Sequence, residues 1–287
     1  MNGIDLLSSG YTKLCVCAAV IAGFAAAPAA AAPITFNTAL PVSEGEIIVR
    51  EQVVFSQSSA PGIDIDAVTA LTVGGYGITP RWSVFGVLPL THIETDIDGV
   101  ASDRFGLGDA LIFSRFEAFA WDGQGATVRF APLLGVRVPT GEDGNTGDGS
   151  VDVFGGLIAT IATTDFNFGS QLVYTENRAA DGVEAGDTLA FDTSLQYRAW
   201  PRRLSAETPG FLFGVLESNI TWQGGTRFGG VPDPQTSGTG FSISPGLQYV
   251  TQRWIADLAV TIPVANSFDR TSVTPDYSVL TSLRVNF

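Results

Sequence analysis

The stretch Tyr277-Ser-Val-Leu-Thr-Ser-Leu-Arg-Val-Asn-Phe287 decides the fold class of this chain. Every second residue lies on one mainly apolar face, and the residues between them form a mainly polar face, with Leu280 as the exception. A period of two predicts a β-strand with one apolar face and one polar face. The closing strand of a membrane β-barrel needs this pattern, because it meets lipid outside and water inside and pairs with the first strand. For this stretch alone, the last strand of a soluble sandwich is the alternative.

Composition points to many strands in one large domain. The 287 residues include 33 Gly, 19 Phe and 15 Pro, and turn-forming clusters recur at short intervals. After the amino-terminal region no stretch reaches the roughly 18 uninterrupted apolar residues that a membrane helix needs. The formal net charge of −14 argues against nucleic acid and against anionic lipid headgroups, since both require basic patches.

Residues 1–31 are predicted to be a signal peptide that is cleaved after Ala31. Lys13 precedes a short apolar core and a run of small residues, whereas a membrane anchor would need a longer core. Both cysteines, Cys15 and Cys17, lie inside this segment. The mature chain is therefore expected to carry no disulfide and no zinc–thiolate site.

The remaining chain predicts an all-β transmembrane antiparallel up-and-down barrel of about twelve strands. Residues 32–44 are expected to form a periplasmic amino-terminal segment, and residues 45–287 the barrel. In the first strand Glu51 falls on the apolar face, which requires either a bulge or a place at the membrane edge. The expected strands lie near residues 47–56, 63–79, 82–91, 109–121, 126–138, 151–162, 166–174, 189–199, 211–222, 241–249, 254–264 and 277–287.

The connections between these strands favour a barrel over a sandwich. With the amino-terminus in the periplasm, short turns such as 163–165 and 250–253 alternate with longer loops outside. The links 56–62 and 198–210 break this rule. All five tryptophans fall at strand ends, where membrane interfaces favour an apolar ring with a wet N–H. The longer loops are expected at residues 92–108, 139–150, 175–188, 223–240 and 265–276.

Charged residues on the polar strand faces are the candidates for lining the lumen. Mixed signs suit a lining that selects solutes by charge and size, or a ladder of cross-strand pairs that stiffens a narrow barrel. Both readings stay open, although the mixture argues against a channel dedicated to acidic oligosaccharides. The candidates are Asp109, Arg115, Glu117, Arg129, Arg137, Asp192, Arg198, Glu217, Asp257 and Arg284.

Two resemblances add expectations. The ending resembles the carboxy-terminal signal of bacterial outer-membrane barrels, which implies recognition by the barrel-assembly machinery through Tyr277, Val279, Leu283, Val285 and Phe287. Short motifs in order along the chain also resemble the MetA-pathway phenol-degradation family, which implies an outer-membrane location in a Gram-negative bacterium and passage of small, aromatic or apolar molecules. These motifs are residues 33–41 with Glu44-Gly-Glu46, Gly106-Leu-Gly-Asp109, Pro139-Thr-Gly141, Ser244-Pro-Gly-Leu-Gln-Tyr249 and Ile262-Pro-Val264.

Catalytic and metal chemistry find little support in the sequence. The single histidine, His92, lacks the His-x-Ser-Asn-Gly pattern expected of an outer-membrane phospholipase, and a polar rim residue is the simpler interpretation. The stretch Asp143-Gly-Asn-Thr-Gly-Asp-Gly149 misses the spacing of a calcium-binding EF-hand, and Asx and Gly turns explain it better. We therefore expect no enzyme, no metal and no cofactor.

The function expected from the sequence is a passive outer-membrane channel for small solutes, with the lipid bilayer as its surroundings. The alternative is a plugged structural or adhesive barrel that acts through its acidic external loops. The sequence leaves open whether residues 32–44 plug the lumen. Acidic loop residues such as Asp96, Asp98 and Asp103 predict a preference for cations at low salt, against a competing account in which Arg129 and Arg137 dominate.

Overall fold

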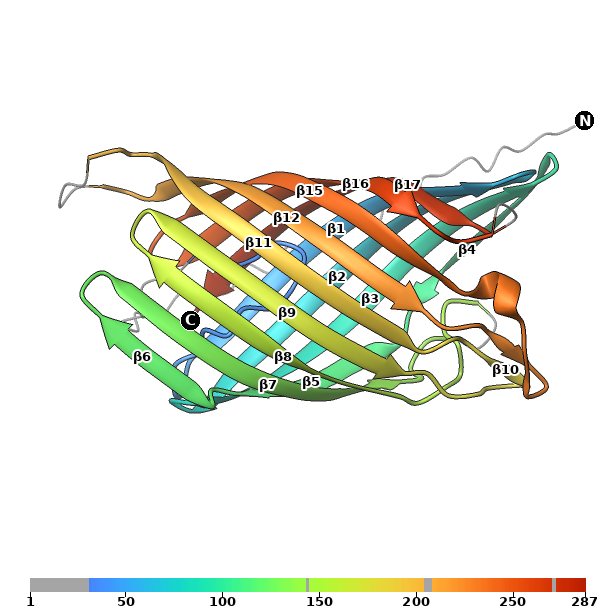
Figure 1. Cartoon of the computed structure of the whole chain (residues 1–287), viewed down its shortest axis with the longest axis horizontal. Coiled ribbons are helices and arrows are strands. Elements are labelled where there is room, and N and C mark those ends of the chain that lie inside the picture. The colour runs from blue at the N-terminus through green and yellow to red at the C-terminus, as the bar shows by residue number, and fades with distance from the viewer. Residues whose placement is uncertain (1–30, 143–144, 204–207, 270–271) are drawn as a thin grey trace, which may run out of the picture.

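The computed structural model describes residues 31–142, 145–203, 208–269 and 272–287, and the predicted signal peptide, residues 1–31, lies outside this part except for Ala31. The described chain forms one closed antiparallel barrel of twelve strands (Figure 1). Three-residue helix η1 (Pro234–Thr236) lies in a connection, and no helix among the described residues is long and apolar enough to cross a membrane. The predicted fold class is confirmed.

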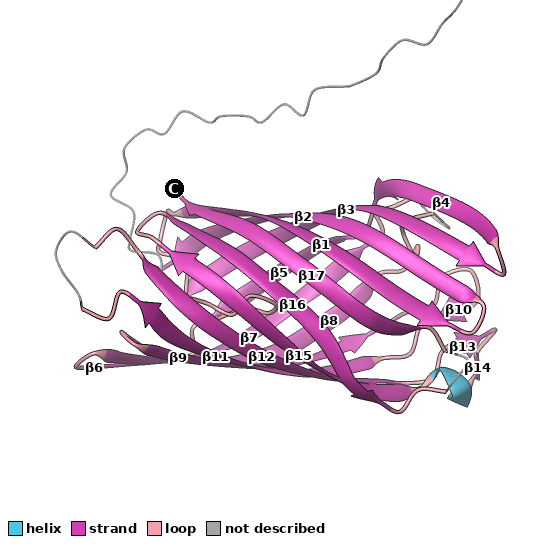
Figure 2. Ribbon diagram, turned by 90° about the horizontal axis from the view of Figure 1, so that it is seen from above, coloured by secondary structure: helices cyan, strands magenta, loops and turns pink. Residues whose placement is uncertain are grey.

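Each barrel strand is hydrogen-bonded to the next in chain order (Figure 2). The fourth strand is divided at two breaks into β4, β5 and β6, and a separate three-stranded sheet of β10 (Val183–Glu184), β13 (Arg227–Phe228) and β14 (Val231–Pro232) lies at one end. The barrel strands are β1 (Ile47–Ala60), β2 (Ile63–Thr79), β3 (Trp82–Ile97), β4 (Val100–Leu107), β5 (Ala110–Phe116), β6 (Phe119–Gly123), β7 (Ala126–Val138), β8 (Asp152–Thr163), β9 (Phe166–Glu176), β11 (Thr188–Trp200), β12 (Phe211–Gln223), β15 (Gly238–Val250), β16 (Trp254–Asn266) and β17 (Thr274–Asn286).

The barrel closes between its first and last strands, as the alternating pattern of the last strand predicts. Strand β1 pairs with β17 from Ile48 opposite Asn286 onward. At the end of this seam, the Phe287 N–H donates to the Ile47 carbonyl at 2.8 Å and the Ile47 N–H donates back at 3.3 Å. The seam therefore leaves no open sheet edge at this position.

The prediction of a loop over residues 92–108 was wrong. Strand β3 continues to Ile97 and β4 begins at Val100, with Asp98 and Gly99 forming a two-residue turn in the left-handed region. The residues 93–97 keep the alternation of the strand before them, so the sheet continues beyond the barrel wall. Strands β1 and β2 extend in the same way, which explains the short link at residues 56–62. We call the projecting part of β2, β3 and β4 (residues 63–67 and 93–104) the tongue.

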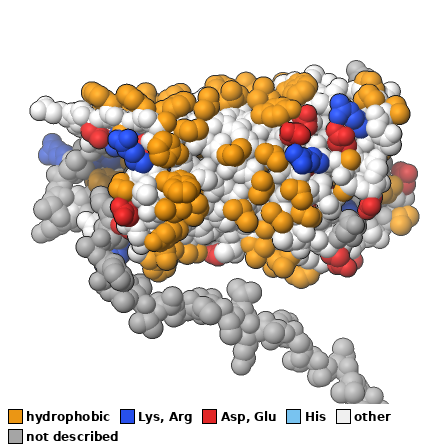
Figure 3. Space-filling view, turned by 90° about the horizontal axis from the view of Figure 1, so that it is seen from below, with side chains coloured by type: hydrophobic (Ala, Val, Ile, Leu, Met, Phe, Trp, Pro, Cys, Tyr) orange, Lys and Arg blue, Asp and Glu red, His pale blue; other side chains and the backbone are white. Residues whose placement is uncertain are grey.

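The outer wall is apolar, as lipid requires. Leu134 on β7 and Leu258 on β16 are 65% and 48% exposed, and all five tryptophans are among the exposed large hydrophobic side chains. On the face seen in Figure 3, hydrophobic side chains are spread along the barrel, and acidic and basic side chains gather toward its two ends. No register shift occurs in β1 near Glu51, so its carboxylate faces outward, four residues from the strand start, and accepts a hydrogen bond from Thr72. The structure therefore excludes the bulge, and a place at the membrane edge stays the expectation for Glu51.

Candidate functional site

The lumen contains a piece of the chain itself. Residues 32–43, which we call the inner segment, follow the inside of the wall and meet the strands one after another before β1 begins. Ile34 and Ala39 are each 1% exposed and Val42 is 6% exposed. The segment thus lies inside the barrel, at the end where the short turns join the strands; this end is called the turn end, and the opposite end the loop end.

Polar side chains of the wall satisfy the backbone of the inner segment, which has no secondary structure of its own to do so. Gln248 on β15 accepts from the Ala32 N–H at 3.1 Å and donates to its carbonyl at 2.8 Å. Further along, the Ala39 N–H donates to Thr160 on β8 and the Val42 N–H donates to Ser83 on β3. These contacts fix the course of the segment around the lumen.

The strongest anchor is Glu217 on β12, which is 1% exposed. One carboxylate oxygen accepts the Ile34 N–H at 2.8 Å, and the other accepts both the N–H and the hydroxyl of Thr35. Hydrogen bonds to an ionised acceptor are roughly twice as strong as neutral ones. The partly buried Thr35 is therefore tied directly to the wall.

Two arginines hold carbonyl groups of the inner segment. Arg115 on β5 donates to the carbonyls of Thr38 and Leu40, and its guanidinium lies 4.7 Å from the ring centroid of Phe85. Arg50 on β1 donates to the Ile34 carbonyl at 2.8 Å and lies 3.3 Å from the carboxylate of Asp257. The lumen face therefore grips both the N–H and the carbonyl groups of the segment.

Close approach of the segment depends on glycine in the wall. A Cβ at Gly77 on β2 would lie 1.9 Å from the carbonyl oxygen of Ser43, and one at Gly169 would lie 2.9 Å from a side-chain carbon of Pro33. A backbone approach this close excludes any side chain. Gly77 also forms a bridge with Glu44, so the segment joins the sheet there before β1 starts.

The ten predicted lumen residues separate into three groups. Asp109 and Arg137 lie at the loop end, where Asp109 accepts the N–H groups of Gly141 and Asp148 and Arg137 lies 3.2 Å from Asp152. These contacts hold the loop between β7 and β8, in which Asp143 lies outside the described residues.

A second group stiffens the turn end of the wall. The Arg129 side chain lies 2.8 Å from both Glu117 and Asp122. Arg198 is ion-paired with Asp165 on the turn before β9 and donates to the carbonyl of Pro201. The structure thus places Arg129 and Arg198 in the cross-strand and turn pairs that the stiffening interpretation describes.

The third group lies around the inner segment and consists of Arg115, Asp192, Glu217, Asp257 and Arg284. Asp192 accepts hydrogen bonds from Gln171 and Asn219 and is 7% exposed. Asp257 accepts from Gln248 and Ser282 and is also 7% exposed. These buried carboxylates are satisfied by neighbouring side chains, as buried charge requires.

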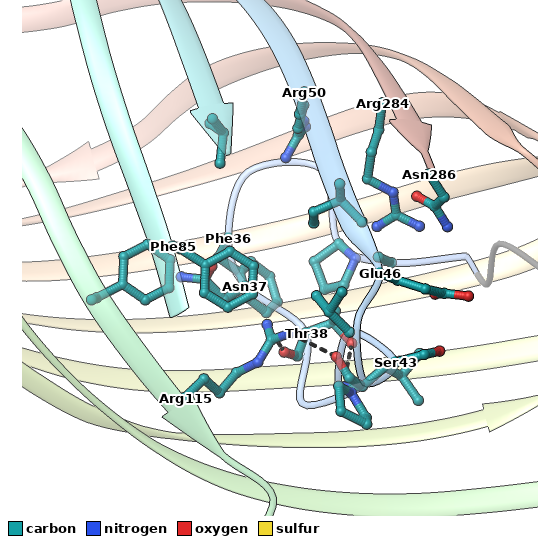
Figure 4. A pocket seen from close by; sticks show the side chains of 18 residues that line it. Phe36, Asn37, Thr38, Ser43, Glu46, Arg50, Phe85, Arg115, Arg284 and Asn286 are labelled. Carbon is teal, nitrogen blue, oxygen red and sulfur yellow. Dashed lines mark hydrogen bonds between the residues drawn. The ribbon is translucent and has the colours of Figure 1, made fainter. Parts of the chain in front are cut away.

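Two larger cavities lie in the described part of the lumen. One, of about 180 Å³, lies between the inner segment and strands β1, β2, β3, β5 and β17 (Figure 4). The other, of about 530 Å³, lies nearer the loop end between β1, β12, β15, β16 and β17. Its lining side chains among the described residues, such as Ser56, Asn219, Thr261 and Phe268, are hydroxyl, amide or apolar, and none of these is charged.

Several functional residues were missed from the sequence. Arg50 lies on the polar face of its strand by the same alternation as the predicted candidates. The pattern of this strand is less clear, because Glu51 interrupts its apolar face. The aromatic pair Phe85 and Phe113 was not among the predicted lumen residues, whereas both face the lumen and are under 9% exposed. Alternation in the tightly buried β5 could have shown Phe113 on the face of Arg115, because the two positions differ by two.

Residues 50–267 match the family described as "Putative MetA-pathway of phenol degradation". The chain belongs to this family.

The fold is similar to that of two solved structures. An outer-membrane channel from Pseudomonas putida F1 is 11% identical with a TM-score of 0.64, and the match covers 86% of this chain and 97% of that one. The beta domain of the Bordetella autotransporter BrkA is 13% identical with a TM-score of 0.52, covering 85% of this chain and 100% of that one. No curated protein sequence matches the chain. A closed barrel with an even strand number, an apolar outer wall and aromatic strand ends is the architecture of the outer membrane, and the protein is an outer-membrane barrel.

Proposed function

We propose that the protein is a passive channel for small solutes with aromatic or apolar character, and that it is not an enzyme. The observation that carries this proposal is the uncharged lining of the 530 Å³ cavity near the loop end. Ligand sites for such molecules are mostly apolar with a few placed polar groups. Phe241, Phe268 and Val273 supply apolar surface there, and Ser56, Thr221 and Thr261 supply hydroxyl groups.

The family and the solved channel support this proposal. The family description refers to phenol degradation, and the channel from Pseudomonas putida F1 shares the barrel along nearly its whole length. His92 lies on β3 directly before the tongue, with Nε2 4.0 Å from a carboxylate oxygen of Glu94, and its ring packs edge-on against Phe105. These surroundings suit the rim residue expected from the sequence.

Liposome swelling tests the proposal with solutes that lipid alone excludes. We expect liposomes containing the protein to swell in methyl glucoside, and to swell at least as fast in the larger phenyl glucoside, because the neutral lining favours a ring. Protein-free liposomes serve as the blank, because equal swelling without protein would mean that the solute crosses the lipid by itself. No swelling in either solute would overturn the channel and favour the plugged barrel, in which the inner segment closes the lumen.

Assembly requires further partners, which we propose from the sequence. The inner segment is proposed to face the periplasm, and the strand carrying Tyr277 and Phe287 is proposed to be read by the barrel-assembly machinery. Tyr277 and Leu283 are both exposed on the outer face of β17. An assembly factor would therefore find these side chains accessible before the strand meets lipid.

A further inference from the structure

The 180 Å³ cavity beside the inner segment has an aromatic side and a cationic side. Its volume is comparable with an apolar cavity of about 150 Å³ that binds benzene. It is lined by side chains from the inner segment and from five wall strands. A single six-membered ring with a small substituent therefore fits between the segment and the wall.

Three phenylalanines form the aromatic side. The rings of Phe85 and Phe113 are stacked, with centroids 4.8 Å apart and an interplanar angle of 13°. Phe36 of the inner segment also lines the cavity (Figure 4), and its ring lies against Gly169 on β9. Offset-stacked and edge-to-face contacts favour an aromatic guest over an aliphatic one of the same size.

Three arginines form the cationic side. Arg50, Arg115 and Arg284 line the cavity together with one carboxylate, that of Glu46, so the described lining residues carry a net charge of two positive units. Just outside this lining, Asp257 is paired with Arg50. The side chains of Arg50 and Arg284 approach from one side, and that of Arg115 approaches from the other (Figure 4). The hydrogen-bond partners of Arg115 are carbonyl groups, which bring no negative charge into the cavity.

We propose that this cavity binds a small aromatic anion, a single ring that carries one carboxylate or phenolate group. The ring contacts Phe36, Phe85 and Phe113, and the acid group is held by Arg284 with Arg50 beside it. Guanidinium groups match carboxylates in a two-pronged geometry, and the low-dielectric lumen strengthens the attraction. This inference rests on the proposed channel function, and it specifies the class of solute that binds beside the inner segment during passage.

Binding to the mature protein in a non-ionic detergent tests the proposal by titration calorimetry. Three probes separate the two sides of the cavity: benzoate has both features, benzyl alcohol lacks the charge, and cyclohexanecarboxylate lacks the aromatic ring. We expect saturable binding of benzoate, with each of the other two at least about tenfold weaker. Salt should weaken benzoate binding, because it screens charge. Equal binding of benzoate and benzyl alcohol, or no saturable benzoate binding, would overturn the site.

Matched variants locate the binding. Arg284→Gln and Phe113→Leu should each weaken benzoate about tenfold or more. The controls are Arg253→Gln on an exposed turn and Phe119→Leu on the outer wall, which should bind as the parent does. If the lumen variants fail to fold, the comparison of the three probes on the parent still decides. Swelling in phenyl glucoside without benzoate binding would sink this site alone, whereas benzoate binding without swelling would sink the channel alone.

Discussion

One carboxylate oxygen of Glu217 accepts both the backbone N–H of Thr35 at 3.0 Å and its side-chain hydroxyl at 2.6 Å. Glu217 belongs to β12 and Thr35 to the inner segment, 182 positions apart in the chain. A buried carboxylate that finds its partners in an otherwise irregular segment ties two parts of the molecule that could separate without breaking the barrel. The inner segment is therefore the part of the lumen whose removal would widen it most directly.

Replacing Glu217 should loosen the inner segment and open the lumen. Glu217→Ala removes three hydrogen bonds to an ionised acceptor, each worth about 1.5–3 kcal/mol. We expect a higher single-channel conductance in planar bilayers and faster liposome swelling than in the parent. The matched control is Glu117→Gln, a buried carboxylate that pairs with Arg129 on the wall and not with the segment. Unchanged conductance in Glu217→Ala would show that the segment does not limit passage.

Glycine at position 77 should be required for the segment to stay against the wall. In Gly77→Ala the new methyl group would lie 1.9 Å from the Ser43 carbonyl oxygen, so the backbone there has to move. Hydrogen exchange measured by mass spectrometry should be faster over residues 39–43 than in the parent, as those hydrogen bonds open more often. Gly74→Ala on the same strand is the control, because a Cβ there meets nothing within 4 Å. Equal exchange in the two variants would count against a tight contact.

The barrel wall could be predicted from sequence because each strand carries its own period of two. Val128, Phe130 and Leu134 on β7 face outward, with Ala131 and Leu133 between them buried, as alternation alone indicates. Register follows from the same pattern, since a slip by one residue would turn every apolar side chain into the lumen.

The course of the inner segment could not be predicted, because it has no period. Its position depends on single contacts with distant residues, such as Ala32 with Gln248 and Ala39 with Thr160, which are 216 and 121 positions apart. The missed strand β4 has a different cause. Its acidic residues suggested an open loop, whereas Asp103 lies opposite Glu94 in the register of a continuing sheet.

The lipid-facing positions should reject charge. Leu258→Arg or Val128→Arg should lower the yield of folded barrel, because an arginine at the middle of the bilayer costs about 2–4 kcal/mol. Folding is measured by the shift in gel mobility on heating. Ser56→Arg provides the comparison, since Ser56 lines the wide lumen cavity and its replacement can reach water. Equal yields of the three variants would mean that the assigned faces are wrong.

The sign of ion selectivity should be set by the narrow part of the lumen rather than by the acidic loops. The tongue residues Glu94 and Asp103 lie opposite each other on a sheet that projects past the barrel wall, where bulk water screens their charge over about 8 Å at physiological salt. The two arginines of the competing account are neutralised locally, because Arg129 pairs with Glu117 and Arg137 with Asp152. Arg50, Arg115 and Arg284 line the smaller cavity, where low-dielectric walls focus their field. Arg50 is paired with Asp257 there, whereas Arg115 is hydrogen-bonded to carbonyl groups, which carry no net charge.

We therefore expect reversal potentials in a salt gradient to show a severalfold preference for anions in the open Glu217→Ala variant. Adding Arg284→Gln should shift the reversal potential toward the value for a cation-selective channel, because the cavity lining loses one positive charge. Replacing Asp96, Asp98 and Asp103 together by asparagine should leave the potential unchanged, although the loop account predicts a loss of cation preference. A cation preference that disappears in this triple variant would show that the acidic residues of the tongue, and not the arginines, determine selectivity.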